Sequence, residues 1–189
     1  MPFLLRMNLW VRYLFIIPDC RGCMCPMFIR PIIAALLTLA AIASANAQIV
    51  ALGASSTAGY GVGAAAAFPA QLEAILRAKG RPMSVSAAGV SGDTTGGMLA
   101  RLPAAVPAGT KIVILQIAGN DAMKGMSPVT AAANRAELRK QLHARGIRTI
   151  EADGYVMAAL RSRLRQADGI HMTAEGHRRV AEQLAASIR

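Results

Sequence analysis

From residue 48 onward, short apolar runs alternate with longer amphipathic segments. The apolar runs predict strands at 48–53, 82–89, 111–119 and 147–152, because short runs of apolar and β-branched residues bounded by glycine or proline fit buried strands. The second run is the weakest of the four. The third, KIVILQIAG, is the strongest, and its lack of polar alternation indicates a strand that is buried on both faces.

Segments with apolar residues three and four positions apart predict the helices. They lie at 68–80, 96–106, 129–146, 155–166 and 173–188. Alternation of such helices with nearly continuous apolar strands predicts one α/β domain over 48–189, in which helices cover a parallel sheet of four or five strands. Sheets of this kind bind ligands beyond the carboxyl ends of their strands. The loops that follow the strands are therefore where functional side chains are expected.

The first 47 residues read as a targeting segment. Arg30 precedes the apolar run at 32–43, and the sequence Ala-Asn-Ala follows at 45–47, a pattern typical of a secretory signal peptide. The run is too short to span a bilayer comfortably. We expect cleavage after Ala47 and a periplasmic or secreted protein without a membrane span. Residues 1–26 are interpreted as a mis-assigned extension upstream of a start at Met27, in preference to a membrane anchor.

The cysteine positions and the charge distribution argue against a zinc site and against nucleic-acid binding. Cys20, Cys23 and Cys25 precede the expected cleavage site, and no second Cys or His cluster completes a zinc site. The net charge of +11 raises the possibility of nucleic-acid binding, but the basic residues are scattered and only 4% of residues are aromatic. A basic soluble surface without base-stacking platforms is the better interpretation. We expect no nucleic-acid partner, metal or cofactor.

Three strand ends carry polar or glycine-rich loops. The first strand runs into GASSTAGYGVG with Ser55, the second into AAGVSGDTTGG with Gly92, and the third into AGND with Asn120. Taken singly, these could be a helix cap, a flexible loop and an ordinary turn. The lysine of a phosphate-binding loop is absent, and the glycines do not follow the dinucleotide-binding order.

Near the C-terminus, QADGIHMTAEGH places Asp168 three residues before His171. Acyl transfer needs a hydroxyl nucleophile, a base, an acid that orients the base, and donors for the oxyanion. The serine, glycine and asparagine at successive strand ends, followed by Asp-x-x-His, supply that set. The other two histidines, His143 and His177, fall on helices and are predicted to face solvent.

These segments resemble the SGNH hydrolases, also called GDSL esterases or lipases, over residues 48–189. IVALGASSTAGYGV is similar to the family's first block, AGVSGDTTGGMLARL to the second, AGND to the third and DGIH to the last. The resemblance is strongest to bacterial secreted arylesterases, lysophospholipases and acyl-CoA thioesterases. It implies a three-layer α/β/α, flavodoxin-like fold and a triad of Ser55, His171 and Asp168. It also implies an oxyanion hole formed by the amides of Ser55 and Gly92 and the side chain of Asn120.

The chain departs from the family pattern at three places. Ala54 replaces the aspartate of Gly-Asp-Ser, Ala118 replaces a common glycine, and the region 121–167 is short. The first two are expected to leave the triad intact, and the third to alter the loops that cover the substrate. The resemblance implies hydrolysis of an ester or thioester of a small acyl substrate, through an acyl-enzyme and without a cofactor. A carbohydrate O-acetylesterase and a non-catalytic binding protein on the same fold remain alternatives.

Overall fold

The computed structural model describes residues 48–188. The predicted signal peptide, its cleavage site and the three cysteines lie outside this range. Within it, four parallel strands form one sheet in the order β2-β1-β3-β4. The strands are β1 (Ile49–Gly53), β2 (Val85–Gly89), β3 (Ile112–Gln116) and β4 (Arg148–Glu151). All four strands predicted from the sequence are confirmed.

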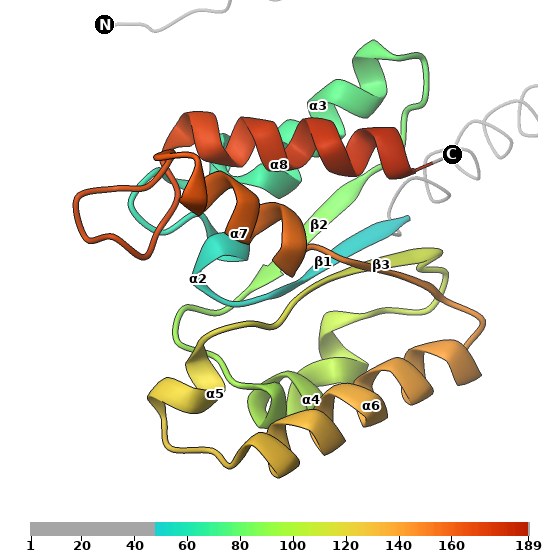
Figure 1. Ribbon diagram of the computed structural model, residues 1–189. Coiled ribbons are helices and arrows are strands. Elements are labelled where there is room, and N and C mark those ends of the chain that lie inside the picture. Colours follow the sequence, from blue (N-terminus) through green and yellow to red (C-terminus); the bar gives the residue numbers. More distant parts are fainter. Residues whose placement is uncertain (1–47, 189) are drawn as a thin grey trace, which may run out of the picture. The chain divides into compact units, whose positions relative to one another are not determined.

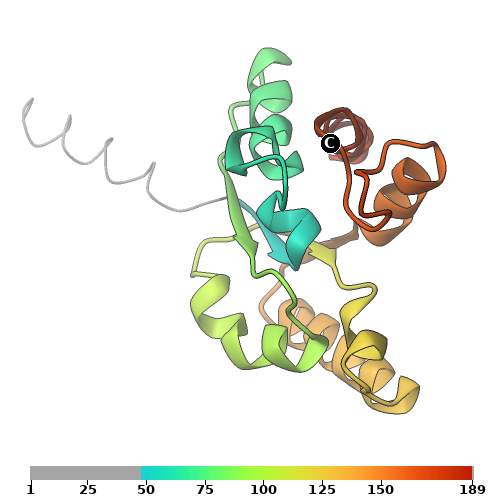
Figure 2. The ribbon, with the colours of Figure 1, turned by 90° about the vertical axis from the view of Figure 1, so that its left-hand side faces the viewer.

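Helices cover both faces of the sheet, which confirms the three-layer α/β/α prediction (Figures 1 and 2). One face carries α3 (Phe68–Ala78), α7 (Asp153–Arg161) and α8 (Ala174–Ser187). The other carries α4 (Thr95–Ala105) and α6 (Pro128–Ala144). Along the chain, β2 is added on one side of β1, and the chain then crosses β1 to add β3 on its other side. Right-handed crossovers then place the connecting helices on opposite faces.

The central strands are apolar on both sides because each side meets a helical layer. In β1, Ile49 and Ala51 pack with α3, α7 and α8, whereas Val50 and Leu52 pack with α4 and α6. Successive side chains of a strand point to opposite faces. Every residue of β1 and β3 is buried, which explains their unbroken apolar sequences.

Three one-turn helices were not predicted: α2 (Ser55–Ala58), η2 (Ala64–Ala66) and α5 (Asn120–Met123). They are too short to produce a helical period in the sequence. The predicted helix 155–166 also ends earlier, at Arg161, and Arg163 has a positive φ of 61°. Within residues 48–188, no helix is long and apolar enough to cross a membrane.

His177 is buried, so the prediction that it faces solvent is wrong. It is 1% exposed, and its Nδ1 accepts a hydrogen bond of 3.2 Å from the backbone N–H of Phe68, the first residue of α3. Its ring also stacks on Phe68, with centroids 6.4 Å apart. Burial, and secondarily the charge of His171, lowers the pKa of His177 from 6.5 to about 4. The neutral ring therefore fastens α8 to the start of α3, whereas His143 on α6 is exposed as predicted.

We expect His177→Ala to destabilise the protein by about 2–4 kcal/mol at pH 7, because it leaves a cavity and an unpaired buried N–H. Since the folded pKa is the lower one, the unfolded chain binds the extra proton. The contribution of His177 to the free energy of unfolding is therefore complete above pH 6.5. It falls by at most about 3 kcal/mol as the pH drops toward about 4. Urea unfolding at pH 7.5 and 5 measures both effects. His143→Ala is the matched control, and an equal loss in both variants would contradict the assignment.

Candidate active site

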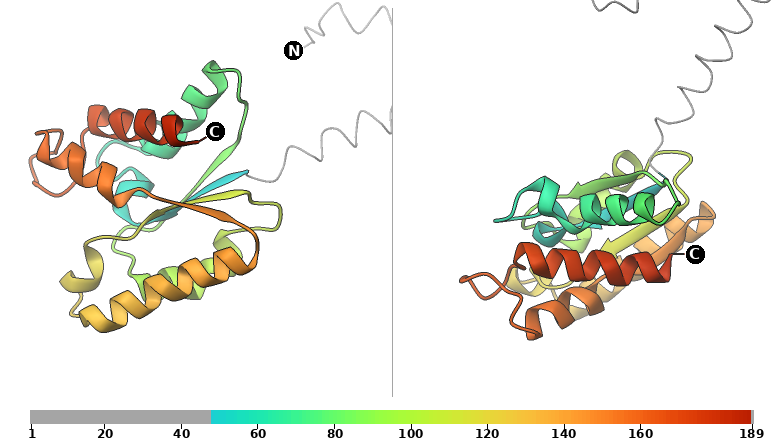
Figure 3. Two further views of the ribbon diagram at one scale, coloured as in Figure 1. Left: turned by 45° about the vertical axis from the view of Figure 1, so that its right-hand side comes forward. Right: turned by 90° about the horizontal axis from the view of Figure 1, so that it is seen from above.

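The polar strand ends meet at one edge of the sheet. Figures 1 and 3 show α2, α5 and the loop between α7 and α8 gathered beyond the carboxyl ends of the strands. A cavity of about 570 Å³ opens there, and its lining includes Ser55, Gly92, Asn120 and His171. The structure thus brings together four of the five residues singled out in the sequence. Asp168 is connected to the cavity through His171.

Asp168 and His171 form a tight pair. Asp168 Oδ2 lies 2.6 Å from His171 Nδ1, and Oδ1 accepts the backbone N–H groups of Ile170 and His171, each at 3.0 Å. The bond to the imidazole and these two amide bonds lower the pKa of Asp168 from 3.8 to about 2. An ionised carboxylate can only accept, so Nδ1 carries a proton. In the neutral ring, Nε2 is left with a lone pair for a substrate or nucleophile proton.

Tyr60 and Gln166 hold the His171 loop, and neither was singled out from the sequence. The Tyr60 ring lies against the imidazole of His171, with centroids 4.3 Å apart and planes tilted by 31°. Gln166 Nε2 donates to the carbonyls of Tyr60 at 2.9 Å and Met172 at 2.8 Å. The loop that carries His171 is thereby joined to the loop that follows α2.

Ser55 is the first residue of α2, directly after β1. It lines the cavity with His171, and in the described part of the chain its hydroxyl makes no hydrogen bond. Catalytic hydrogen bonds of this kind often tighten only when substrate binds. The first amides of a helix have no partner within the helix, so the N–H of Ser55 is suited to donate to an oxyanion.

Gln116 supports the turn that carries Ser55. Its Oε1 accepts the backbone N–H of Ala54 at 3.1 Å and the Thr57 hydroxyl at 3.4 Å. A buried amide from the neighbouring strand β3 thus fixes the position where the family's aspartate is replaced by Ala54. Behind the turn, β2 and α2 approach so closely that a Cβ on Gly89 would lie 2.3 Å from the Ala58 nitrogen.

A guanidinium organises the loop that carries Gly92. Arg101 on α4 donates to the carbonyls of Gly53 and Ala88, each at 3.0 Å, and pairs with Asp93 at 2.7 Å. It therefore joins the ends of β1 and β2 to the residue after Gly92. Gly92 has φ 76°, a conformation that favours glycine.

Asn120 is anchored to the same loop. Its Nδ2 donates to the carbonyl of Asp93 at 2.8 Å, and a carboxamide has a second N–H that this bond does not use. The side chain lines the cavity. Asn120 can therefore be held by the Gly92 loop and still donate to a bound oxygen.

Asp153 follows β4 and was also missed. Its Oδ1 accepts the backbone N–H groups of Ile117 at 2.9 Å and Ala118 at 3.0 Å, which fixes the segment leading to Asn120. Burial raises the pKa of this carboxyl, against the effect of those two hydrogen bonds. The rule that pointed to the ends of the first three strands applies equally to the fourth, so this residue could have been found.

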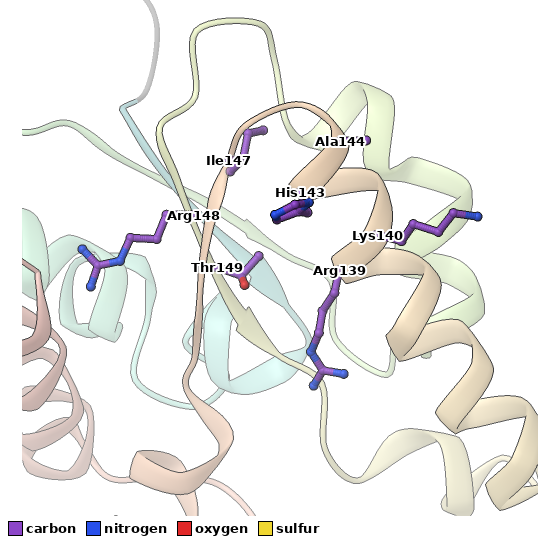
Figure 4. A pocket seen from close by; sticks show the side chains of 7 residues that line it. All are labelled: Arg139, Lys140, His143, Ala144, Ile147, Arg148 and Thr149. Atoms are coloured by element: carbon purple, nitrogen blue, oxygen red, sulfur yellow. The ribbon is translucent and has the colours of Figure 1, made fainter.

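A second cavity of about 630 Å³ lies between α6 and the amino end of β4, away from all five predicted residues (Figure 4). Its basic side chains already have partners. Arg139 pairs with Glu151 at 2.8 Å, Lys140 with Glu137 at 3.4 Å, and Arg148 donates to the carbonyl of Ser187 at 2.9 Å. The described lining of this cavity contains no serine, and no aspartate beside its one histidine, so it lacks the combination of groups found in the first cavity.

Comparisons with known proteins find esterases of similar sequence and fold. Esterase TesA of Pseudomonas aeruginosa is 33% identical over 120 residues, which are 61% of this chain and 58% of that protein. The crystal structure of AlinE4, an SGNH-hydrolase family esterase, is 35% identical with a TM-score of 0.51, and covers 56% of this chain and 58% of its own. The psychrotrophic esterase EstA from Pseudoalteromonas shares the fold at 19% identity, with a TM-score of 0.67 over 76% of this chain and 97% of its own.

The chain spans about half the length of the curated relatives it matches. The sequence model of the GDSL-like lipase/acylhydrolase family matches residues 51–166. That range contains the loops of Ser55, Gly92 and Asn120, and it stops just before the pair formed by Asp168 and His171. With most of the described domain matched and the fold shared, the chain belongs to the GDSL-like lipase/acylhydrolase family.

Proposed function

We propose that this protein is a serine esterase that hydrolyses carboxylic ester or thioester bonds. The observation that carries the proposal is the single cavity lined by Ser55, Gly92, Asn120 and His171, with His171 bound to Asp168 at 2.6 Å. A hydroxyl, a base with its orienting acid, and oxyanion donors are the requirements of acyl transfer. Family membership supports the same reaction class.

In the proposed reaction, His171 Nε2 takes the proton of Ser55 as Oγ attacks the acyl carbonyl. The Asp168 carboxylate keeps the proton on Nδ1 and stabilises the imidazolium that forms. The amides of Ser55 and Gly92 and the free N–H of Asn120 donate to the oxyanion. His171 then protonates the leaving group, and water deacylates Ser55 through the same base.

The cavity favours an apolar acyl substrate. Val156 and Leu160 on α7 line it, together with the exposed side chains of Met123, Met157 and Ile170. Pockets of this size with a few polar groups at one end are typical of small-molecule sites. We therefore propose a small acyl ester or thioester as the substrate.

Hydrolysis of short p-nitrophenyl esters by the purified protein tests this function. We expect turnover above the buffer rate and covalent labelling by a fluorophosphonate probe. A protein that neither labels nor hydrolyses p-nitrophenyl esters, aryl thioesters or acetylated sugars would leave a binding role in place of the enzyme. Turnover confined to acetylated sugars would favour a carbohydrate O-acetylesterase.

We also propose that the protein is exported and begins at Gln48 after processing. The basic residue, apolar run and small-residue site at 30–47 support this proposal. The intact mass of protein recovered from the periplasm or medium measures the start. Material that retains Cys20–Cys25 would contradict it.

Asn120→Ala is expected to lower kcat by about 10²–10³-fold with little change in KM, because it removes a donor that acts on the oxyanion. Steady-state kinetics on a p-nitrophenyl ester measures the effect. Asn134→Ala is the matched control, since Asn134 donates to Thr95 outside the cavity, and it should retain nearly full kcat. Unchanged kcat in Asn120→Ala would mean that AGND serves only as a turn.

A further inference from the structure

Three arginines, one at the end of α7 and two in the loop between α7 and α8, differ from the other described arginines. Between residues 48 and 188, the side chains of Arg161, Arg163 and Arg165 have no carboxylate or carbonyl partner. The remaining described arginines all have one: Arg77, Arg81, Arg101, Arg135, Arg139, Arg145, Arg148, Arg178 and Arg179. The unpaired guanidiniums are thus concentrated in one short segment.

Two of the three, Arg161 and Arg165, line the cavity that contains Ser55 and His171, and Arg163 does not. Both are exposed, so their charges are hydrated. Neither guanidinium is used in an ion pair or hydrogen bond within the described part of the chain, so both are available at the cavity. The backbone of Arg165 is held by a bridge to Met172, next to His171. The segment that positions the catalytic imidazole therefore also presents two free cations.

The nearby carboxylates are already engaged. Asp153, the one acidic residue in the described cavity lining, accepts two backbone N–H groups through Oδ1. Asp168 binds His171 and two amides. Neither forms an ion pair with Arg161 or Arg165, so the charge at this end of the cavity is not neutralised by the described chain.

Guanidinium groups bind carboxylates and phosphates through paired N–H donors. Met157, Leu160 and Ile170 line the cavity beside the two arginines, which places apolar surface next to the cationic end. We infer that the preferred substrate carries a carboxylate or phosphate group, bound by Arg161 and Arg165 while the ester lies at Ser55. This inference rests on the proposed esterase function and assigns its specificity.

Matched pairs of soluble esters test the inference. One pair, 4-acetoxybenzoate and its methyl ester, places the charge on the leaving group. The other, mono-4-nitrophenyl adipate and 4-nitrophenyl hexanoate, places it on the acyl chain. We expect wild type to have the higher kcat/KM for the anionic member of at least one pair. Arg161→Gln/Arg165→Gln should lower that value by about tenfold, as expected for lost hydrogen bonds to a charged group, and leave the neutral partner unchanged.

Arg163→Gln is the matched control for the single variants Arg161→Gln and Arg165→Gln. It removes the same charge from the same segment but lies outside the cavity lining, so it should retain the anionic preference. Added salt should weaken the preference of wild type more than that of the double variant. In a competition arm, inorganic phosphate should inhibit wild type more strongly than the double variant.

The failures of the two proposals are distinguishable. If wild type hydrolyses the neutral esters and shows no anionic preference in either pair, the anion site is wrong and the esterase stands. An equal loss of kcat/KM in Arg163→Gln would also overturn the anion site, because the effect would then come from the net charge of the segment. An equal loss of kcat/KM on the neutral esters would overturn it too, because the effect would then come from damage to the loop. If wild type hydrolyses none of the four esters, both proposals fall together.

Discussion

Ser55→Ala and His171→Ala should each reduce kcat for a p-nitrophenyl ester by roughly 10⁴–10⁶-fold, the largest effect expected from any substitution in this protein. In the proposed mechanism Ser55 supplies the oxygen that bonds to the acyl group. His171 is proposed as the base, because the bond from Nδ1 to Asp168 leaves its Nε2 unprotonated. In the described cavity lining His171 is the one histidine, so no second imidazole can take over as the base. The double variant should be little worse than either single variant, because members of one catalytic unit are strongly non-additive.

Ser56→Ala is the control for Ser55→Ala. Both hydroxyls line the cavity, but Ser56 is 7% exposed and is the second residue of α2. A fluorophosphonate probe should label wild type and Ser56→Ala and fail on Ser55→Ala. If labelling were lost in Ser56→Ala and retained in Ser55→Ala, the nucleophile would be Ser56 instead of Ser55. Additive losses in the Ser55 and His171 double variant would mean that the two side chains do not act together.

The fold was largely predictable because burial on two faces gives a pattern that survives in the sequence. IVALG and KIVILQ must fill two cores at once, so they contain no polar alternation, and the helices between them show one apolar stripe each. The strand order adds the position of the site, since β1 lies between β2 and β3. The loops after these three strands therefore meet at one edge of the sheet.

The supporting residues were harder to predict because their partners are distant in the sequence. His177 reads as a helix-surface residue until α3 is known to place the Phe68 N–H against its ring. Gln116 sits in an apolar strand, and its role depends on a turn that begins at Ala54. Arg101 reads as a charged helical position, and only the assembled sheet brings the carbonyls of Gly53 and Ala88 within its reach.

Asp168 differs from these supporting residues. Its hydrogen-bond partners are close in the sequence, and its proposed role is chemical. Its Oδ1 accepts two backbone N–H groups and its Oδ2 accepts from His171. A merely structural aspartate would be replaced well by asparagine, whose carbonyl oxygen can still accept the two amides. The asparagine NH₂ would then face Nδ1 and donate to it. The imidazole proton then lies on Nε2, and Nε2 can no longer accept the proton of Ser55.

We therefore expect Asp168→Asn to lower kcat by on the order of 10⁴-fold, less than the loss of the nucleophile, with little change in the thermal unfolding midpoint. Steady-state kinetics and thermal unfolding of the same preparation measure the two quantities. Because the pKa of the wild-type carboxyl is about 2, it is ionised at the neutral pH of these measurements, so the variant is compared with a charged carboxylate. Asp168→Ala, which also lacks the acceptor for the two amides, should lose stability as well as activity. Nearly full activity in Asp168→Asn would show that this carboxylate only shapes the loop, and the orienting acid would have to be sought elsewhere in the cavity.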